Sequence, residues 1–209
     1  SSDLIKINST KGITNLNPHF NIKESATTFR MLLAIVAMNC HRYSFTLGSQ
    51  LASRPHSDIV NFLNSNGAEI TFEDSVCCGK QIEKIANSQY NFGISSQGFS
   101  GILIAFAFKG VHLGDINGEI VSRQYIEMTK DVLAEFGFKS NAGYEFEGKP
   151  LAKHKYIVPS DCSTLANYVA MNAVGNKIKY KCVKGNHPDK GFVENIFEQR
   201  EELDIEEIG

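Results

Sequence analysis

Three stretches of the chain are apolar on nearly every side over the length of a helix. They run from Phe29 to Met38, from Ser96 to about Phe108 and from Leu165 to Val174, and hydroxyl side chains stand at or just before the start of each. A helix that is apolar all round is buried, and Ser or Thr at its start caps free backbone N–H groups. The pattern therefore predicts three buried helices.

Two amphipathic helices follow the first two buried ones. Pro55 is predicted as the first residue of one, which ends at Gly67, and the other runs from Ile126 to Phe136 and ends at Gly137. Proline suits the first position of a helix, and glycine suits the position after its end. Gly67 and Gly137 lie 70 residues apart, so the same order of elements recurs along the chain.

Short strands and turns fill the intervals between these helices. Turns are predicted at 48–54 and 122–125, and a last helix at 189–199. Strands are predicted at 4–7, 43–47, 68–72, 115–121 and 177–183, and from Phe138 onward. The starts of the buried helices, at Thr27, Ser96 and Ser163, are 69 and 67 residues apart. Three matching copies predict an α/β protein built from a repeated unit of this length.

Composition and charge limit the classes of partner. The chain has 209 residues, 42% hydrophobic and 21% charged, which is enough for one large or two modest domains. Its 21 basic and 23 acidic residues leave a formal charge of −2. Because the chain has no excess of basic residues, its charge does not indicate nucleic-acid binding. No apolar run is long enough to span a membrane, so no membrane partner is expected. Any anion site must therefore be local.

Cysteine and histidine give no metal signal. The five cysteines are an odd set without C-x-x-C spacing, so neither disulfides nor a zinc site is indicated, and reduced thiols of a cytoplasmic protein are expected. Cys77 and Cys78 are expected on opposite faces of a strand. His41, His56 and His187 fall in predicted turns, where solvated side chains are expected.

The start of the second buried helix is the first candidate site. Ser95, Ser96 and Gln97 precede a long apolar run. The first backbone N–H groups of a helix lack internal partners and carry the positive end of the helix dipole, which suits a phosphate. The simpler alternative, a serine that only caps the helix, stays open for this segment alone.

Five short motifs follow one another at the spacing of the repeat. They are the segments Glu24–Arg30, Ser53–Pro55, Ser95–Gln97, Ser122–Thr129 and Asp161–Thr164. In that order they resemble the enolpyruvyl transferase family, in the branch that acts on shikimate 3-phosphate, and the resemblance extends from about Asn21 to Gln199.

The resemblance implies both a fold and a reaction. The fold is an inside-out α/β barrel, two lobes that each contain three βαβαββ units with the helices inside. Residues 1–158 would be two units of the lobe that binds shikimate 3-phosphate, and 159–209 the start of the second lobe, so the chain would be the middle half of a synthase. The reaction transfers enolpyruvyl from phosphoenolpyruvate to shikimate 3-phosphate, a step toward chorismate and the aromatic amino acids, and uses no cofactor or metal.

The resemblance also implies which residues touch shikimate 3-phosphate. The serines that hold its phosphate correspond to Ser95, Ser96 and Ser122. A glutamine that contacts both substrates corresponds to Gln97, and a tyrosine that lies against the shikimate ring corresponds to Tyr125.

Phosphoenolpyruvate would be bound by Gln97, by Arg54 and by the backbone at Ala26, where the family usually has glycine. A planar guanidinium suits carboxylate and phosphate oxygens. The family's catalytic lysine and its acid and base carboxylates have no counterpart here, so no catalytic residue is predicted and this chain alone is expected to be inactive.

Two alternatives remain at this stage. One is a non-catalytic module with the same fold, and the other is a related transferase that acts on a UDP-sugar. In either case, a lobe with only two of its three units would expose apolar helix surface, which predicts self-association.

Overall fold

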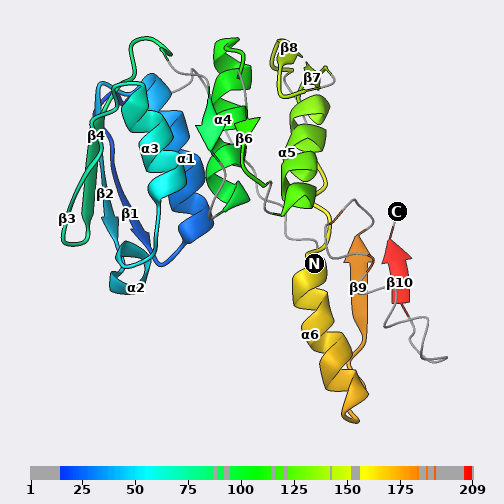
Figure 1. The fold of residues 1–209 in the computed structure, drawn as a ribbon. Helices are drawn as coiled ribbons and strands as arrows, with labels where there is room; N and C mark the ends of the chain where they lie inside the picture. Colours follow the sequence, from blue (N-terminus) through cyan, green and yellow to red (C-terminus); the bar gives the residue numbers. More distant parts are fainter. Residues whose placement is uncertain are drawn as a thin grey trace. The chain divides into compact units, whose positions relative to one another are not determined.

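The computed structural model describes residues 15–86, 89–91, 95–113, 116–119, 122–141, 143–151, 156–183, 187, 191 and 205–208. They fall in two compact units, Ser1–Val121 and Ser122–Gly209 (Figure 1). The strand predicted at 4–7 and the helix predicted at 189–199 lie outside the described residues. The predicted domain boundary after residue 158 stays a prediction.

A four-stranded sheet forms one side of the first unit. Its strands are β1 (His19–Lys23), β2 (Arg42–Leu47), β3 (Thr71–Glu73) and β4 (Val76–Lys80). They lie in the order β1-β2-β4-β3. β1 pairs with β2 in parallel, whereas β4 is antiparallel to both of its neighbours. A parallel pair needs a crossover connection, which here is a helix.

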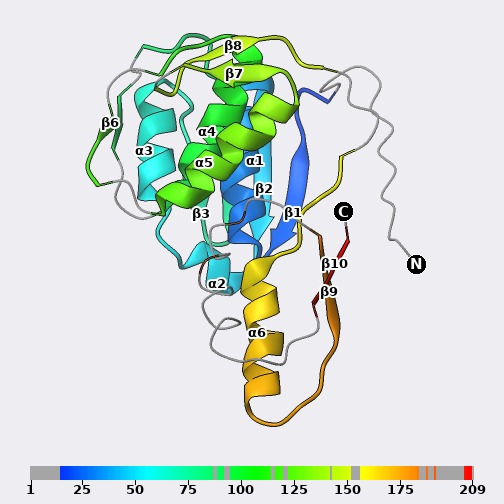
Figure 2. The same ribbon diagram turned by 90° about the vertical axis from the view of Figure 1, so that its right-hand side faces the viewer.

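Helices are layered on this sheet. α1 (Ala26–Asn39) packs against both β2 and α4 (Ser96–Lys109) and lies between them in Figure 1, while in Figure 2 the three elements overlap along the line of sight. α3 (Ser57–Ser65) packs against α1 and α4, and the short helix α2 (Ser49–Ala52) precedes it. The unit also contains a parallel pair, β5 (Tyr90–Asn91) and β6 (Ile116–Asn117). The contact between α1 and α4 therefore forms the centre of this unit.

The two long helices of the first unit are buried as their sequences predict, whereas the prediction of a third buried helix was wrong, because α6 (Cys162–Ala173) buries only Leu165 and Val169. Phe29 and Leu33 of α1, and Phe99 and Leu103 of α4, have no exposed surface. Burying a side chain of this size contributes about 1.5–3 kcal/mol. The ring of Phe29 meets that of Phe45 on β2 edge to face, 5.2 Å between centroids, which fixes α1 on the sheet.

Within its described residues, the second unit contains two helices, each followed by a strand pair. α5 (Arg123–Glu135) is followed by the antiparallel pair β7 (Phe138–Ser140) and β8 (Phe146–Gly148). α6 (Cys162–Ala173) is followed by β9 (Tyr180–Val183), which pairs in parallel with β10 (Ile205–Ile208). Asp161 caps α6, and its carboxylate accepts a hydrogen bond from Ser163 N at 2.9 Å.

The order of elements confirms the predicted α/β repeat. β1-α1-β2-α3-β3-β4 is one βαβαββ unit, and β5-α4-β6-α5-β7-β8 is the next. In both, the first two strands are parallel and the last two antiparallel. Gly67 and Gly137 have φ of 90° and 98° at matching positions after α3 and α5, a backbone region that favours glycine.

Several element boundaries differ from the prediction. α1 begins at Ala26 because Ser25 is its cap, and 48–54 contains α2 rather than only a turn. Pro55 is not the first residue of α3. Its carbonyl accepts from the Arg30 side chain instead of a helical N–H, and the helical hydrogen bonds begin at the carbonyl of His56. The predicted turn at 122–125 becomes the first turn of α5, and β3 begins three residues later than expected.

The adjacent cysteines of β4 are on opposite faces, as predicted. Cys77 is buried and Cys78 is exposed. Burial, with Cys78 nearby, raises the pKa of the Cys77 thiol to about 12.

This difference predicts selective thiol labelling. Because the thiolate is the reactive form, Cys78 should react with a thiol reagent at mildly alkaline pH at least roughly a hundredfold faster than Cys77. Labelling followed by peptide mass spectrometry measures both rates, and Cys78→Ser should remove the fast label of this strand. Equal labelling rates at the two cysteines would contradict their placement on opposite faces of β4.

Candidate functional site

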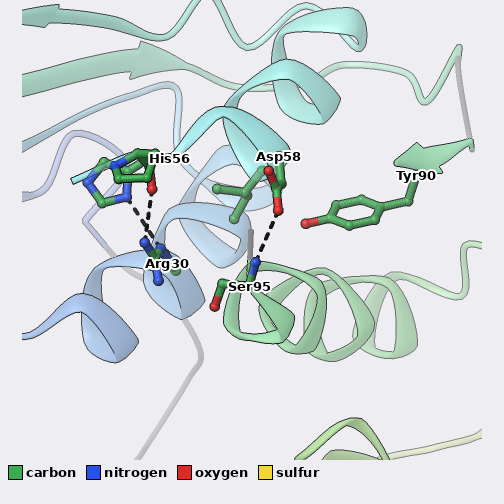
Figure 3. A pocket seen from close by; sticks show the side chains of 8 residues that line it. Arg30, His56, Asp58, Tyr90 and Ser95 are labelled. Atoms are coloured by element: carbon green, nitrogen blue, oxygen red, sulfur yellow. Dashed lines mark hydrogen bonds between the residues drawn. The ribbon is translucent and has the colours of Figure 1, made fainter. Parts of the chain in front are cut away.

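The start of α4 is held in place by two polar contacts. Ser95 caps the helix, and its Oγ accepts from Gln97 N at 3.2 Å. Ser95 N donates in turn to Asp58 Oδ2 of α3 at 3.2 Å (Figure 3). The carboxylate of Asp58 therefore ties the start of α3 to the start of α4.

Arg30 is the centre of the polar contacts beside this helix start. Its side chain is buried, and three of its nitrogens donate hydrogen bonds. Nη1 donates to Gln97 Oε1 at 2.8 Å, Nη2 to the Pro55 carbonyl at 2.9 Å, and Nε to His56 Nδ1 at 3.3 Å. Burial lowers the pKa of Arg30, and Asp58 opposes that shift. An arginine remains charged in proteins, so Arg30 is a fixed cation that joins α1, the loop before α3, and α4.

His56 is the buried partner of Arg30. Its Nε2 lies 3.0 Å from the Leu51 carbonyl, and its Nδ1 faces Arg30 Nε. Since a carbonyl only accepts and Arg30 only donates, the ring is neutral with its proton on Nε2. Burial lowers the pKa of His56, and the nearby charges of Arg30 and Arg54 lower it further. The expectation of a solvated histidine at 56 was wrong, because the ring is buried and packs against Phe29 and Phe72.

A pocket opens beside these groups (Figure 3). Its cavity volume is about 10 Å³, roughly the room for a single water molecule. Its polar lining comes from α1, α3, β5 and α4, namely Arg30, His56, Asp58, Tyr90 and Ser95. Gly98 also lines it, and a Cβ there would lie 2.9 Å from Ile59 Cβ, so glycine lets α4 approach α3. The result is a small hollow beside a fixed cation at the start of a helix.

Five of the predicted binding residues belong to the first unit. Ser95, Ser96 and Gln97 form the cap and first turn of α4, and Gln97 contacts Arg30. Ala26 begins α1 one turn before Arg30, and Arg54 is exposed in the loop that Arg30 holds at Pro55.

The loop with Arg54 is anchored from the other side as well. Glu24 Oε2 accepts from Leu51 N at 2.8 Å, which fixes α2. Glu24 also fills the space in which a Cβ on Gly48 would lie. The residues just before α1 therefore position the segment that carries Arg54.

The other two predicted residues, Ser122 and Tyr125, belong to the second unit. Ser122 is the N-cap of α5 with φ of 53°, and its side chain makes no capping hydrogen bond. A non-glycine residue in this region is strained, and such strain often occurs at functional sites. Tyr125 is half-buried in the first turn of α5, with its ring 6.4 Å from that of His187. Their roles in binding stay predictions.

Sequence reasoning missed His56, Asp58 and Tyr90 as parts of this pocket. A signal was present for Arg30, since a lone charge in an otherwise apolar helix must find partners when that helix is buried. No local pattern indicates that His56 supplies one of them. Within the described ranges, no group of three or more His, Cys, Asp or Glu residues is placed to hold a metal ion. No helix there is long and apolar enough to cross a membrane.

The fold and this polar helix start define a class of protein. The fold is similar to that of EPSP synthase from Acinetobacter baumannii, whose solved structure matches 86% of this chain and 42% of its own with a TM-score of 0.62 and 22% identity. The sequence matches the family described as EPSP synthase (3-phosphoshikimate 1-carboxyvinyltransferase) over residues 3–206. The chain belongs to this family.

Individual relatives agree with the family. The 3-phosphoshikimate 1-carboxyvinyltransferase of Methanopyrus kandleri is 29% identical over 185 residues, which is 81% of this chain and 42% of that protein. The enzyme of the same name from Methanococcoides burtonii is 28% identical and covers 90% of this chain and 49% of its own. The chain thus spans between two fifths and half of the length of these relatives.

Proposed function

We propose that this chain is the part of a 3-phosphoshikimate 1-carboxyvinyltransferase that binds shikimate 3-phosphate. The complete enzyme would transfer enolpyruvyl from phosphoenolpyruvate to the shikimate 5-hydroxyl, in the cytoplasm, on the route to chorismate and the aromatic amino acids. The observation that carries this proposal is the hydrogen bond from Arg30 to Gln97, which fixes a predicted substrate amide at the start of a buried helix.

The phosphate would be bound mainly by hydroxyls and backbone N–H groups. Ser95 and Ser96 stand at the start of α4, and Ser122 stands at the start of α5. Each helix start supplies N–H donors and a positive dipole end, so the phosphate needs no large basic patch. This agrees with the formal charge of −2.

The Gln97 amide would orient the substrates. Because Arg30 donates to Gln97 Oε1, the NH₂ group of Gln97 is directed away from Arg30 and can donate to a substrate oxygen. Arg54 would bind phosphoenolpyruvate beside it, and Tyr125 would lie against the shikimate ring. The groups that transfer protons would come from outside this chain, so we propose binding without turnover.

Calorimetry with shikimate 3-phosphate, and with shikimate as the ligand that lacks the phosphate, tests this function. We expect weak binding of the phosphorylated ligand only. Gln97→Ala should weaken it about tenfold, the effect of one hydrogen bond to a charged ligand. Gln81→Ala is the matched control, since Gln81 follows β4 and its backbone N–H donates to the His41 carbonyl at 3.1 Å. It should leave the affinity unchanged.

Other outcomes would contradict the proposal in distinct ways. A folded chain that binds neither ligand would favour a non-catalytic module with this fold. Competition by a UDP-sugar but not by shikimate 3-phosphate would favour the related transferase. Turnover by the purified chain alone would show that its own groups transfer protons.

Self-association stays a prediction for the isolated chain. Three apolar side chains of α6 and the residue after it, Tyr168, Met171 and Val174, are 39%, 47% and 82% exposed. An uncovered apolar strip of this kind favours association between copies.

A further inference from the structure

The buried histidine beside Arg30 suggests a role in the proposed site. We infer that His56 is a positioning residue: its neutral ring holds Arg30, and Arg30 holds the Gln97 amide, so a proton added to His56 releases Gln97 and weakens binding of the phosphorylated substrate. The binding part of this inference rests on the proposed function.

The hydrogen bonds around His56 allow only one protonation state. Nε2–H donates to the Leu51 carbonyl at 3.0 Å, and Nδ1 accepts from Arg30 Nε at 3.3 Å. Both ring nitrogens are therefore used. A second proton on the ring would be on Nδ1 and would point at the Nε–H of Arg30, so two donors and two positive charges would face each other.

The surroundings of His56 disfavour its cation on balance: burial and two arginines lower the pKa of the ring, and the hydrogen bond to the Leu51 carbonyl opposes them only in part. From α1 it faces Arg30, and its own loop contributes Arg54. From α2 it meets the Leu51 carbonyl, which already accepts the Nε2 proton. The rings of Phe29 and Phe72 pack on it, with centroids 4.9 and 6.1 Å away. Asp58 of α3 acts on Arg30.

The Leu51 carbonyl and the rings of Phe29 and Phe72 hold the His56 ring in place, so protonation must displace Arg30. Arg30 makes its bonds to Gln97 and to Pro55 from the same planar guanidinium that faces His56, so it cannot turn from His56 and keep both. Loss of the Arg30 contact frees the Gln97 side chain to change rotamer, and the substrate must then order it again.

The direction of the pH effect follows from the lowered pKa of His56. Its ordinary value is 6.5, and burial followed by the two arginines holds it below that. The unfolded chain then binds the proton more readily than the folded one, so stability and the Arg30–Gln97 contact are complete above about pH 6.5 and are lost as the pH falls through the folded pKa.

NMR of the unmodified protein tests the geometry without any substrate. The His56 ring nitrogens should report an Nε2–H tautomer at neutral pH. On acidification, the side-chain amide signals of Gln97 should move with the same midpoint as the His56 ring. A Gln97 amide that stays constant through the His56 titration, or an Nδ1–H tautomer, would overturn the inference.

Binding of shikimate 3-phosphate gives the second readout. His56→Asn keeps a neutral acceptor near the position of Nδ1, and His41→Asn, at an exposed histidine of the same unit, is the matched control. One pH unit below the measured pKa of His56, about a tenth of the wild-type rings are neutral, so wild-type affinity should fall about tenfold more than that of His56→Asn. The ligand's own titration is common to all three proteins and cancels in this comparison.

The outcomes separate the two proposals. Equal pH profiles for the wild type and His56→Asn would overturn the role of His56 and leave the function intact. If the wild-type chain binds no shikimate 3-phosphate at any pH, the proposed function fails, and the Gln97 titration by NMR still decides whether His56 holds Arg30.

Discussion

Arg30→Leu is expected to destabilise the first unit by about 2–3 kcal/mol, because the substitution leaves one buried acceptor and two partly buried ones without their donor, and an unmet buried group costs about 1–3 kcal/mol. The acceptors are the Gln97 amide, the Pro55 carbonyl and His56 Nδ1. Leucine recovers part of the lost stability through apolar contact, so the expected destabilisation is smaller than the sum of the three acceptor penalties. Urea unfolding followed by circular dichroism measures the change in free energy.

Two further variants make this result specific. Arg30→Lys keeps the charge but cannot reach three acceptors with one planar group, so an intermediate loss is expected. Arg123→Leu removes an exposed arginine whose nearest carboxylate, Glu127, is 3.9 Å away, and should change stability by less than about 0.5 kcal/mol. If Arg30→Leu were as mild as Arg123→Leu, the polar cluster would have no structural role.

Gly101→Val is expected to cost about 3 kcal/mol or more by separating the two buried helices of the first unit. A Cβ on Gly101 of α4 would lie 2.8 Å from the Met31 Cα and 3.0 Å from the Arg30 carbonyl, both backbone atoms of α1. Backbone cannot rotate away as a side chain can, so the helices must move apart. Overpacking of a core typically costs about 1–3 kcal/mol, and valine adds more volume than the single methyl group of alanine.

Gly101→Ala separates packing from helix propensity. Alanine favours a helix over glycine by about 1 kcal/mol, so stabilisation would show that α1 and α4 are not in close contact. The contact predicts a net loss instead. Gly143→Ala and Gly143→Val are the controls, since no atom lies within 4 Å of a Cβ at that position. Thermal unfolding of the four variants measures the difference.

The burial of the helices could be predicted because each signal lies within one segment. The apolar runs and the serines before them mark α1 and α4, and their side chains and caps agree with that prediction. The glycines at 67 and 137 mark matching helix ends because a left-handed backbone position favours one residue type. Local signals of this kind recur in each copy, and that recurrence made the repeated unit visible.

The polar site is different, because its parts are distant in sequence. Arg30, His56 and Gln97 come from three elements, with separations of 26 and 67 residues for the two hydrogen bonds that join them. A histidine after a proline reads locally as a solvated turn residue. Only the packing of α3 and β3 against α1 makes it a buried acceptor.

The sequence by itself determined the repeat, the burial of α1 and α4 and the hydroxyls at their starts, since hydrophobic period and capping act over a few neighbouring residues. Only the tertiary structure decided which polar groups meet at the start of α4, which protonation state His56 must adopt, and that Gly101 is a point of helix contact. These depend on atoms brought together from separate segments, and desolvation acts only once the surrounding side chains have closed over them.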